Sequence, residues 1–380
     1  MKILSILIVL TAFVPCRFTV RDVGFVDLGD PAYKLHVFVS GQESPAAKAT
    51  LGRLCKAQLR DVNVEVEFVD PDAEKELPAH RLLREMQIQE FPSMVLVHPD
   101  GQAMKIGFQG TFDDVVAPAI ESVASSPLRT RIRERVLRCY CVVVLVEGLD
   151  EAENRRAAQS VRDAFAVIER GFDAMPKAVG DLPSLLTVTA QECQREQVLL
   201  WSLGVGVQPE TASVGVLFGR GRRIGPILDG ADISKDPLLG ILANAGESCE
   251  CGLDRTWMRG PRIPLRWDDD VKQQATKLLG FDPENPVVKS EISGILSKRP
   301  KGNRGARDST PTVAELLAGY SEAPVEDATP VANGSRAEVD ALGPDEADTT
   351  LWVPVLVTAG VMFVVSLLVA AFVFMRRTGR

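Results

Sequence analysis

The sequence predicts an α/β protein in which one arrangement of strands and helices occurs twice. Short apolar runs alternate with helical stretches over residues 30–126, and the same order returns over residues 138–248. A constant offset of 120 residues pairs Ser93 with Ser213, Gly101 with Gly221 and Gly110 with Gly230. This register indicates an internal duplication, so we expect two domains, each with a central mixed sheet flanked by helices.

The first unit reads as four strands and three helices. The run VEVEFV at 64–69 alternates with a period of two, which is typical of a half-buried strand. His98-Pro99-Asp100-Gly101 has the turn chemistry that joins two strands of a hairpin. The expected strands are 34–40, 64–69, 93–97 and 102–107, and the expected helices are 45–59, 79–87 and 113–124.

The second unit follows a basic connector at 129–138 and repeats this order. Gly219-Arg220-Gly221 lies between two strands and does not open a helix, so it predicts a hairpin turn and not a phosphate-binding loop. The expected strands are 141–146, 184–189, 213–218 and 223–228, and the expected helices are 150–171, 194–203 and 237–245.

The order β-α-β-α-β-β-α resembles the thioredoxin fold. The most specific resemblance is Phe91-Pro92-Ser93 at the start of the third strand, where thioredoxins carry a cis-proline facing the active site. The resemblance therefore implies a cis bond before Pro92. In the second copy, the corresponding position is Ala212, so the proline is missing there.

The resemblance fails at the residues that carry thioredoxin chemistry. Thioredoxins place Cys-x-x-Cys at the start of the helix that follows the first strand, where the thiol pKa is lowered. Here residues 41–47 contain no cysteine, and the second copy has Glu147-Gly148-Leu149 after its first strand. Cys55 lies further along an apolar helix face and reads as a small buried hydrophobe. The sequence thus predicts thioredoxin-like domains without a working dithiol.

The segment 249–297 does not belong to a standard thioredoxin unit, and we expect it to dock on the second domain. Its first part contains Trp257 and Trp267, which are typical packing anchors. Two helices follow, one over 268–279 that stops at Gly280 and one that starts at Asn285-Pro286. The segment also contains four arginines, which read as solvated charge: Arg255, Arg259, Arg262 and Arg266.

Four cysteines are the candidate site residues: Cys139, Cys141, Cys249 and Cys251. Residues i and i+2 of a strand share one face, and the closing helix of a thioredoxin-like unit returns to the same end of the sheet, so the two pairs are expected to converge. Structural disulfides or inert thiols are one interpretation, and a lack of convergence is another. A four-thiolate metal site and a redox-active or copper-handling Cys249-Glu250-Cys251 are the alternatives.

The two ends of the chain predict a membrane protein. Residues 1–16 read as a signal peptide, and residues 351–375 form an uncharged apolar stretch long enough for one transmembrane helix. Arginines at 376–380 place this short tail in the cytoplasm. The acidic segment 298–350 is expected to be a disordered linker. The head would then be extracytoplasmic, in the periplasm if the cell is bacterial.

The composition argues against some classes of function but does not identify a partner. A net charge of −8 argues against nucleic acid as a partner, and no paired carboxylates or Ser/His/Asp order stand out. We expect no cofactor and no enzyme activity, but a binding or scaffolding head with a protein partner of unknown identity. The alternative is a membrane-tethered thiol-disulfide oxidoreductase or metal-handling protein that uses Cys249 and Cys251.

Overall fold

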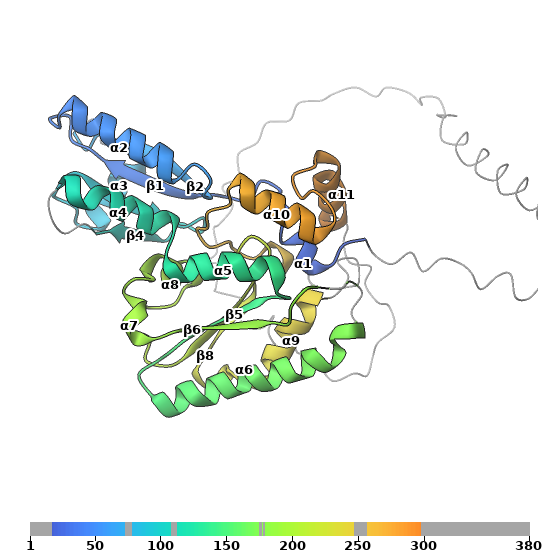
Figure 1. Cartoon of the computed structure of the whole chain (residues 1–380). Coiled ribbons are helices and arrows are strands. Elements are labelled where there is room, and N and C mark those ends of the chain that lie inside the picture. Colours follow the sequence, from blue (N-terminus) through green and yellow to red (C-terminus); the bar gives the residue numbers. More distant parts are fainter. Residues whose placement is uncertain are drawn as a thin grey trace, which may run out of the picture. The chain divides into compact units, whose positions relative to one another are not determined.

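The computed structural model describes residues 17–72, 78–107, 112–174, 177, 179–246 and 257–297. Within these ranges the chain forms two four-stranded sheets, in the strand orders β2-β1-β3-β4 and β6-β5-β7-β8 (Figure 1). In each sheet the first two strands run parallel, and the other neighbours run antiparallel. This is the predicted thioredoxin-like topology, formed twice.

The expected signal peptide, linker, transmembrane helix and cytoplasmic tail lie outside the described residues. Among the helices within the described ranges, none has the length and apolar character needed to cross a bilayer.

The first domain packs helices on both faces of its sheet. Helix α2 starts where the Ser44 hydroxyl accepts a hydrogen bond from the Ala47 amide and Pro45 occupies the first turn. Helices α2 and α4 cover one face, and α3 covers the other. The elements are β1 (Tyr33–Phe38), α2 (Pro45–Gln58), β2 (Val64–Val69), α3 (Pro78–Glu85), β3 (Ser93–Val97), β4 (Ala103–Ile106) and α4 (Phe112–Ala124).

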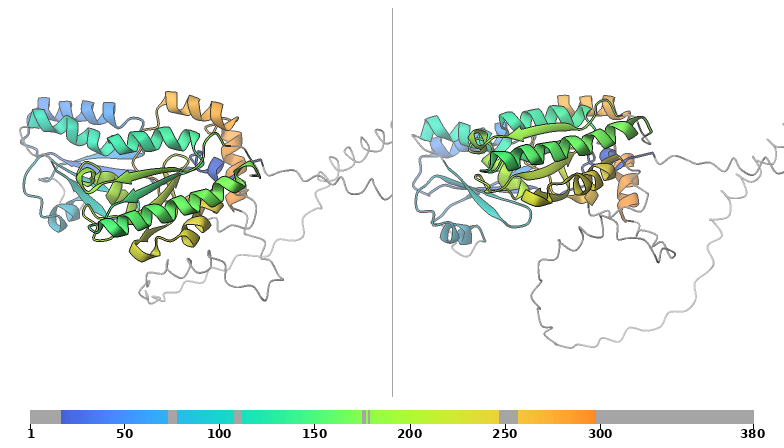
Figure 2. Two further views of the ribbon diagram at one scale, coloured as in Figure 1. Left: turned by 60° about the horizontal axis from the view of Figure 1, so that its bottom comes forward. Right: turned by 90° about the horizontal axis from the view of Figure 1, so that it is seen from below.

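The second domain has a more deeply buried sheet. Every residue of its first strand is buried, and helices α6 and α9 cover one face while α5 and α8 cover the other (Figure 2). The expected helix 194–203 begins later, at Gln197, and a short helix over Ala190–Cys193 precedes it. The elements are α5 (Pro127–Arg138), β5 (Val142–Val146), α6 (Glu151–Gly171), β6 (Ser184–Val188), α7 (Ala190–Cys193), α8 (Gln197–Leu203), β7 (Ser213–Phe218), β8 (Arg222–Asp229) and α9 (Lys235–Gly246).

The basic connector of the sequence is helix α5. The Ser126 hydroxyl caps its first turn by accepting from the Arg129 amide, and Pro127 occupies the first helical position. Ile132 and Val136 lie four residues apart and pack into the core of the second domain. Arg129 is only 1% exposed, so this part of the connector is interior.

The residues before the first domain belong to the second. Helix α1 (Val20–Val23) and Phe18 pack into the core beneath α6 and α9. The Arg21 guanidinium donates to the carbonyls of Leu137 at 3.0 Å and Cys139 at 3.1 Å. These carbonyls lie at the end of α5, where helical groups lack intrahelical partners, so Arg21 closes that helix. The sequence patterns predict no helix, strand or domain for residues 17–29.

The segment after α9 also docks on the second domain. We call residues 257–267 the strap; it begins with a short 3-10 helix, Trp257–Arg259. Trp257 packs against the core on one side of the sheet and Trp267 lies in the core on the other, so both tryptophans are packing anchors. Helices α10 (Asp269–Leu279) and α11 (Pro286–Ser297) add to the same two cores.

The prediction that the arginines of this segment are solvated charge is wrong for two of them. The side chain of Arg262 is 9% exposed and pairs with Asp27 at 3.2 Å. Arg266 pairs with Glu121 at 3.0 Å and donates to the Gln58 carbonyl at 3.0 Å. The acidic partners come from distant parts of the chain, which local composition does not reveal. Arg259 is exposed, and Arg255 lies outside the described residues.

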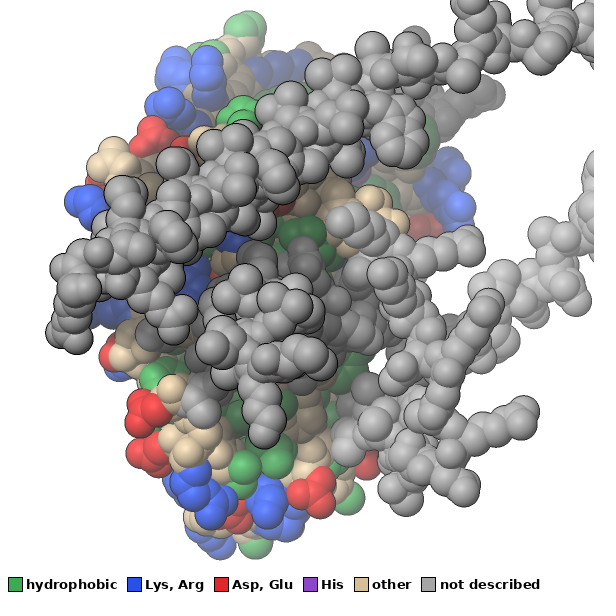
Figure 3. Space-filling view, turned by 90° about the vertical axis from the view of Figure 1, so that its right-hand side faces the viewer, with side chains coloured by type: hydrophobic (Ala, Val, Ile, Leu, Met, Phe, Trp, Pro, Cys, Tyr) green, Lys and Arg blue, Asp and Glu red, His purple; other side chains and the backbone are tan. Residues whose placement is uncertain are grey.

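The surface that Figure 3 shows carries both signs of charge. Lys and Arg side chains lie among Asp and Glu on the parts of this face that grey atoms leave visible. This mixture is the ordinary pattern of a solvated protein surface.

Candidate functional site

The two places at which a thioredoxin carries its dithiol have no cysteine. After β1, the Ser40 hydroxyl donates to Asp72 at 3.0 Å, and the chain passes through Gly41 into α2. After β5, a Cβ atom on Gly148 would lie 2.5 Å from the Thr211 backbone, so the turn is closely packed. The peptide bond between Phe91 and Pro92 is cis, at the position where the resemblance places such a bond.

The four cysteines within the described ranges are buried free thiols: Cys55, Cys139, Cys141 and Cys193. Burial raises the pKa of each thiol, to about 11 for Cys55. A thiol attacks a disulfide or binds a metal as the thiolate, which these pKa values disfavour at neutral pH. The described cysteines therefore have the properties of inert packing groups in this state.

One of the two predicted cysteine pairs is described. Cys139 and Cys141 flank Tyr140 at the start of β5, and the Tyr140 hydroxyl donates to the Leu242 carbonyl of α9 at 2.6 Å. A Cβ atom on Gly246 would lie 2.5 Å from the same hydroxyl, so α9 ends beside this pair. Cys249 and Cys251 lie outside the described residues. Among the described side chains, no group of three or more His, Cys, Asp and Glu residues could hold a metal.

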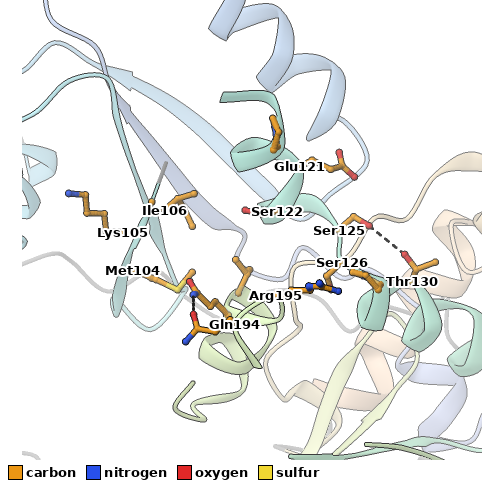
Figure 4. A pocket seen from close by; sticks show the side chains of 15 residues that line it. Met104, Lys105, Ile106, Glu121, Ser122, Ser125, Ser126, Thr130, Gln194 and Arg195 are labelled. Atoms are coloured by element: carbon orange, nitrogen blue, oxygen red, sulfur yellow. Dashed lines mark hydrogen bonds between the residues drawn. The ribbon is translucent and has the colours of Figure 1, made fainter. Parts of the chain in front are cut away.

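A cleft lies between the two domains. It has a volume of about 720 Å³ and lies between β4 and α4 of the first domain and, in the second, the start of α5, the turn before α8 and the start of α8. Figure 4 shows Met104, Lys105 and Ile106 on one side and Gln194 and Arg195 on another. The sequence alone does not reveal this cleft, because its walls come from three separate parts of the chain, 104–107, 118–130 and 194–198.

Hydroxyl groups line the part of the cleft where α4 passes into α5. Ser122 donates to the Ala119 carbonyl at 2.6 Å, and the hydroxyls of Ser125 and Thr130 lie 3.5 Å apart. The Ser126 hydroxyl donates to Glu196. All four hydroxyls thus have partners within the protein. They form a fixed polar surface and are not oriented as nucleophiles, because none contacts a histidine or lysine base in the described residues.

The buried side chain of Arg129 connects the end of α4, beside the cleft, to the strap. Its guanidinium donates to the carbonyls of Val123 at 2.7 Å, Ser125 at 2.7 Å and Pro264 at 3.1 Å. Burial lowers the pKa of Arg129 to about 10, while nearby Glu196 acts in the opposite direction. Arg129 still carries its charge at neutral pH, and one side chain thereby ties the end of α4 to the strap.

Two cations in the cleft are not neutralised by close partners. Lys105 and Arg195 make no side-chain hydrogen bond or ion pair with the described residues, although Arg195 helps to lower the pKa of Glu192 from a distance. The carboxylate of Glu121 in the same cleft is paired with Arg266. The cleft therefore combines apolar side chains, fixed hydroxyls and an excess of positive charge.

No protein-family model matches this chain, and no curated protein matches it. Solved structures that resemble it include human ERp44 in its zinc-bound form, with 13% identity, a TM-score of 0.23 and coverage of 60% of each chain. Full-length ERdj5 matches with 16% identity and a TM-score of 0.20 over 50% of this chain. The first two thioredoxin domains of Saccharomyces cerevisiae Eps1p match with 12% identity and a TM-score of 0.20.

The matched lengths differ among these proteins. The alignment covers 60% of the ERp44 chain, 26% of ERdj5 and 91% of the Eps1p fragment, and 56% of this chain in the last case.

Proposed function

We propose that this chain is a non-catalytic binding module, a pair of thioredoxin-like domains tethered to a membrane. The observation that carries the proposal is the state of the thiols. The turn after β1 and the turn after β5 lack cysteine, and all four described thiols are buried with raised pKa values. A fold that has lost its dithiol keeps its surfaces, and the cleft between the domains is the part suited to a protein partner.

An insulin-reduction assay on the full chain in detergent tests the absence of redox catalysis. We expect no turnover above the dithiothreitol background, for the wild type and for a Cys249→Ser/Cys251→Ser variant alike. The matched control is Cys55→Ser/Cys193→Ser, which removes two thiols from elsewhere. Turnover in the wild type that disappears in the Cys249/Cys251 variant alone would contradict the proposal.

The tether in this proposal is the apolar stretch 351–375, with the head extracytoplasmic and the tail 376–380 cytoplasmic. Its uncharged length supports one helical crossing of the bilayer. We expect the full chain to stay in the membrane pellet after alkaline carbonate extraction, and a Val364→Lys/Leu368→Lys variant to be released. Protease added outside should digest the head. Release of the wild type would rule out the tether.

A second candidate function is thiol or metal chemistry at the cysteine pairs. The position of the end of α9 beside Tyr140 favours it, because Cys249 follows Gly246 by three residues. Three residues of chain reach about 10 Å at most. Differential alkylation, intact mass and metal analysis of the full chain distinguish the readings. Oxidised cysteines that resist mild reductant and bind no metal support structural disulfides. Readily reduced thiols or one bound metal would favour the second candidate.

A further inference from the structure

The outer edge of the second sheet is covered by the strap. Residues 222 and 262 form an antiparallel bridge, in which the Arg223 amide donates to the Pro261 carbonyl at 2.9 Å and the Ile263 amide donates to the Gly221 carbonyl at 3.0 Å. A Cβ atom on Gly260 would lie 1.9 Å from the Arg223 oxygen, so the two backbones are in direct contact. An extended segment thus hydrogen-bonds to the edge strand β8.

Strand β4 holds the equivalent place in the first sheet. It is the outermost strand of the order β2-β1-β3-β4, as β8 is in β6-β5-β7-β8. No described segment pairs with its outer edge. Half of the amides and carbonyls of such a strand point away from its only neighbour. Among the described residues, β8 thus has a partner at its start and β4 has an open edge, while β2 and β6 form the opposite edges of the two sheets.

The open edge faces the cleft between the domains. Four consecutive residues, 104–107, line it. Successive side chains of a strand point to opposite faces, so a cavity against one face would be lined by alternate residues. Contact with all four indicates that the backbone edge of β4 itself forms a wall of the cleft. These four residues offer about 13 Å of edge.

The residues that line the cleft indicate which kind of segment could pair there. Lys105 and Arg195 provide positive charge that no ion pair with the described residues neutralises, whereas Glu121 is already paired with Arg266. Met104 and Val198 provide apolar contacts. A strand that adds to β4 would present side chains alternately to two sides. Acidic and apolar residues in alternation match this lining.

We propose that the cleft binds an extended acidic segment of a partner protein, which adds to β4 as a fifth strand. This inference rests on the proposed function, because it specifies the partner of the binding module. Main-chain hydrogen bonds to β4 would supply affinity, and the two cations would select acidic side chains. A short edge strand with a lysine is also a common protection against aggregation. Protection against aggregation requires neither a second cation, Arg195, across from β4 nor a cleft beside the strand.

The probe is an eight-residue peptide of alternating glutamate and valine, labelled for fluorescence anisotropy, added to the full chain in detergent. One comparison peptide alternates lysine and valine. A second keeps the glutamates but carries N-methyl groups on alternate amides, which block pairing along one edge at unchanged charge. We expect the unmodified acidic peptide to bind at least tenfold more tightly than either.

The matched variants are Lys105→Glu/Arg195→Glu and, as the control, Arg84→Glu, an exposed cation on α3 away from the cleft. The double variant should lose at least tenfold in affinity for the acidic peptide, and the control should bind as the wild type does. Hydrogen exchange on the wild type needs no variant. Bound peptide should slow exchange of the amides at 103–107 and leave those of β8 unchanged.

Three results would overturn the inference. They are equal binding of the acidic and basic peptides, undiminished binding of the N-methylated peptide, and no protection of β4. The insulin assay separates this failure from that of the proposed function. Turnover of insulin with protection of β4 by the peptide would refute the non-catalytic role and retain strand addition. Absence of both would refute strand addition alone.

Discussion

The two domains share a sheet topology and differ in what surrounds it. In the second domain, β5 is buried throughout, the strap covers the edge of β8, and the N-terminal segment, α10 and α11 extend the cores on both faces. In the first domain, α2, α3 and α4 cover the sheet, Val198 and Trp201 of α8 add to its core, Phe68 of β2 is 48% exposed, and β4 faces a cleft.

This difference in surrounding segments leads us to expect different roles for the two domains. The strap, the N-terminal segment, α10 and α11 pack on the second domain, and the strap pairs with the start of its edge strand β8. The first domain keeps an open edge beside polar and charged side chains. On the proposed function, one copy would serve as support and the other as the surface that binds a partner. The following changes test this contrast, in order of decreasing expected effect.

Removal of the buried arginine at the junction should have the largest effect. Arg129→Ala leaves the carbonyls at the end of α4 and the Glu196 carboxylate without their buried partner. Breaking a buried charged network in this way typically costs about 3–5 kcal/mol. We expect urea denaturation to reveal a loss of this size.

The control for that experiment is Arg131→Ala on the same helix. Arg131 is half exposed and lies 4.0 Å from Glu192, a surface pair worth about 0–1 kcal/mol. Equal effects of the two substitutions would show that the junction does not depend on Arg129.

The substitution Gly260→Ala adds a methyl group between the strap and β8, and it should affect β8 without affecting β4. In Gly260→Ala the added Cβ meets the Arg223 oxygen, and such overpacking costs about 1–3 kcal/mol. Hydrogen exchange should accelerate at Arg223 and Ile263, with β4 unaffected.

Gly52→Ala on α2 provides the comparison in the first domain. Nothing lies within 4 Å of the added Cβ there. The substitution should be neutral or stabilise the helix by about 0.5–1 kcal/mol. A loss of stability at Gly52 as large as that at Gly260 would contradict this account of the strap.

Acid should weaken the first domain selectively. Burial lowers the pKa of His36, against the opposing effect of Glu67, while Lys34 lowers it further. In the unfolded chain His36 binds a proton near pH 6.5, whereas in the folded domain it does so only at lower pH. The free energy of unfolding is therefore full above pH 6.5 and decreases as the pH falls below it. The slope is at most about 1.4 kcal/mol per pH unit.

This pH dependence is measured by hydrogen exchange in the first domain between pH 7 and pH 5, with exchange corrected for its intrinsic pH dependence. His36→Gln should flatten the profile. All three histidines lie in the first domain, so the second domain has none to titrate. A wild-type profile that matches His36→Gln would remove His36 as the cause.

The smallest expected effect concerns a single hydrogen bond between the first domain and the strap. The Tyr33 hydroxyl donates to the Arg262 carbonyl at 2.7 Å and also lies beside the Ser202 hydroxyl, and Tyr33→Phe removes the Tyr33 hydroxyl. A buried hydrogen bond contributes about 1 kcal/mol. Thermal unfolding should register that loss, and Tyr320→Phe, outside the described residues, serves as the control for tyrosine removal.

Much of the local structure follows from the sequence because it depends on neighbours. The alternation of 64–69, the turn at 98–101 and the offset between the two copies predict strands, hairpins and a duplication, and the strands at 64–69, 93–97 and 213–218 have these bounds. The stop of α10 at Gly280, whose φ is +74°, is likewise readable, since glycine tolerates that conformation.

The tertiary structure decided what joins distant residues. Arg262 and Asp27 are 235 positions apart, and neither carries a local sign of its partner, so the charge of the strap reads as solvated until the two segments meet. The cleft arises in the same way, from β4, α4 and α8 brought together by folding. Periodicity and turn chemistry specify which elements form, because they act between neighbours in sequence. Which edge is covered and which stays open depends on where a remote segment packs, and only the folded chain determines that.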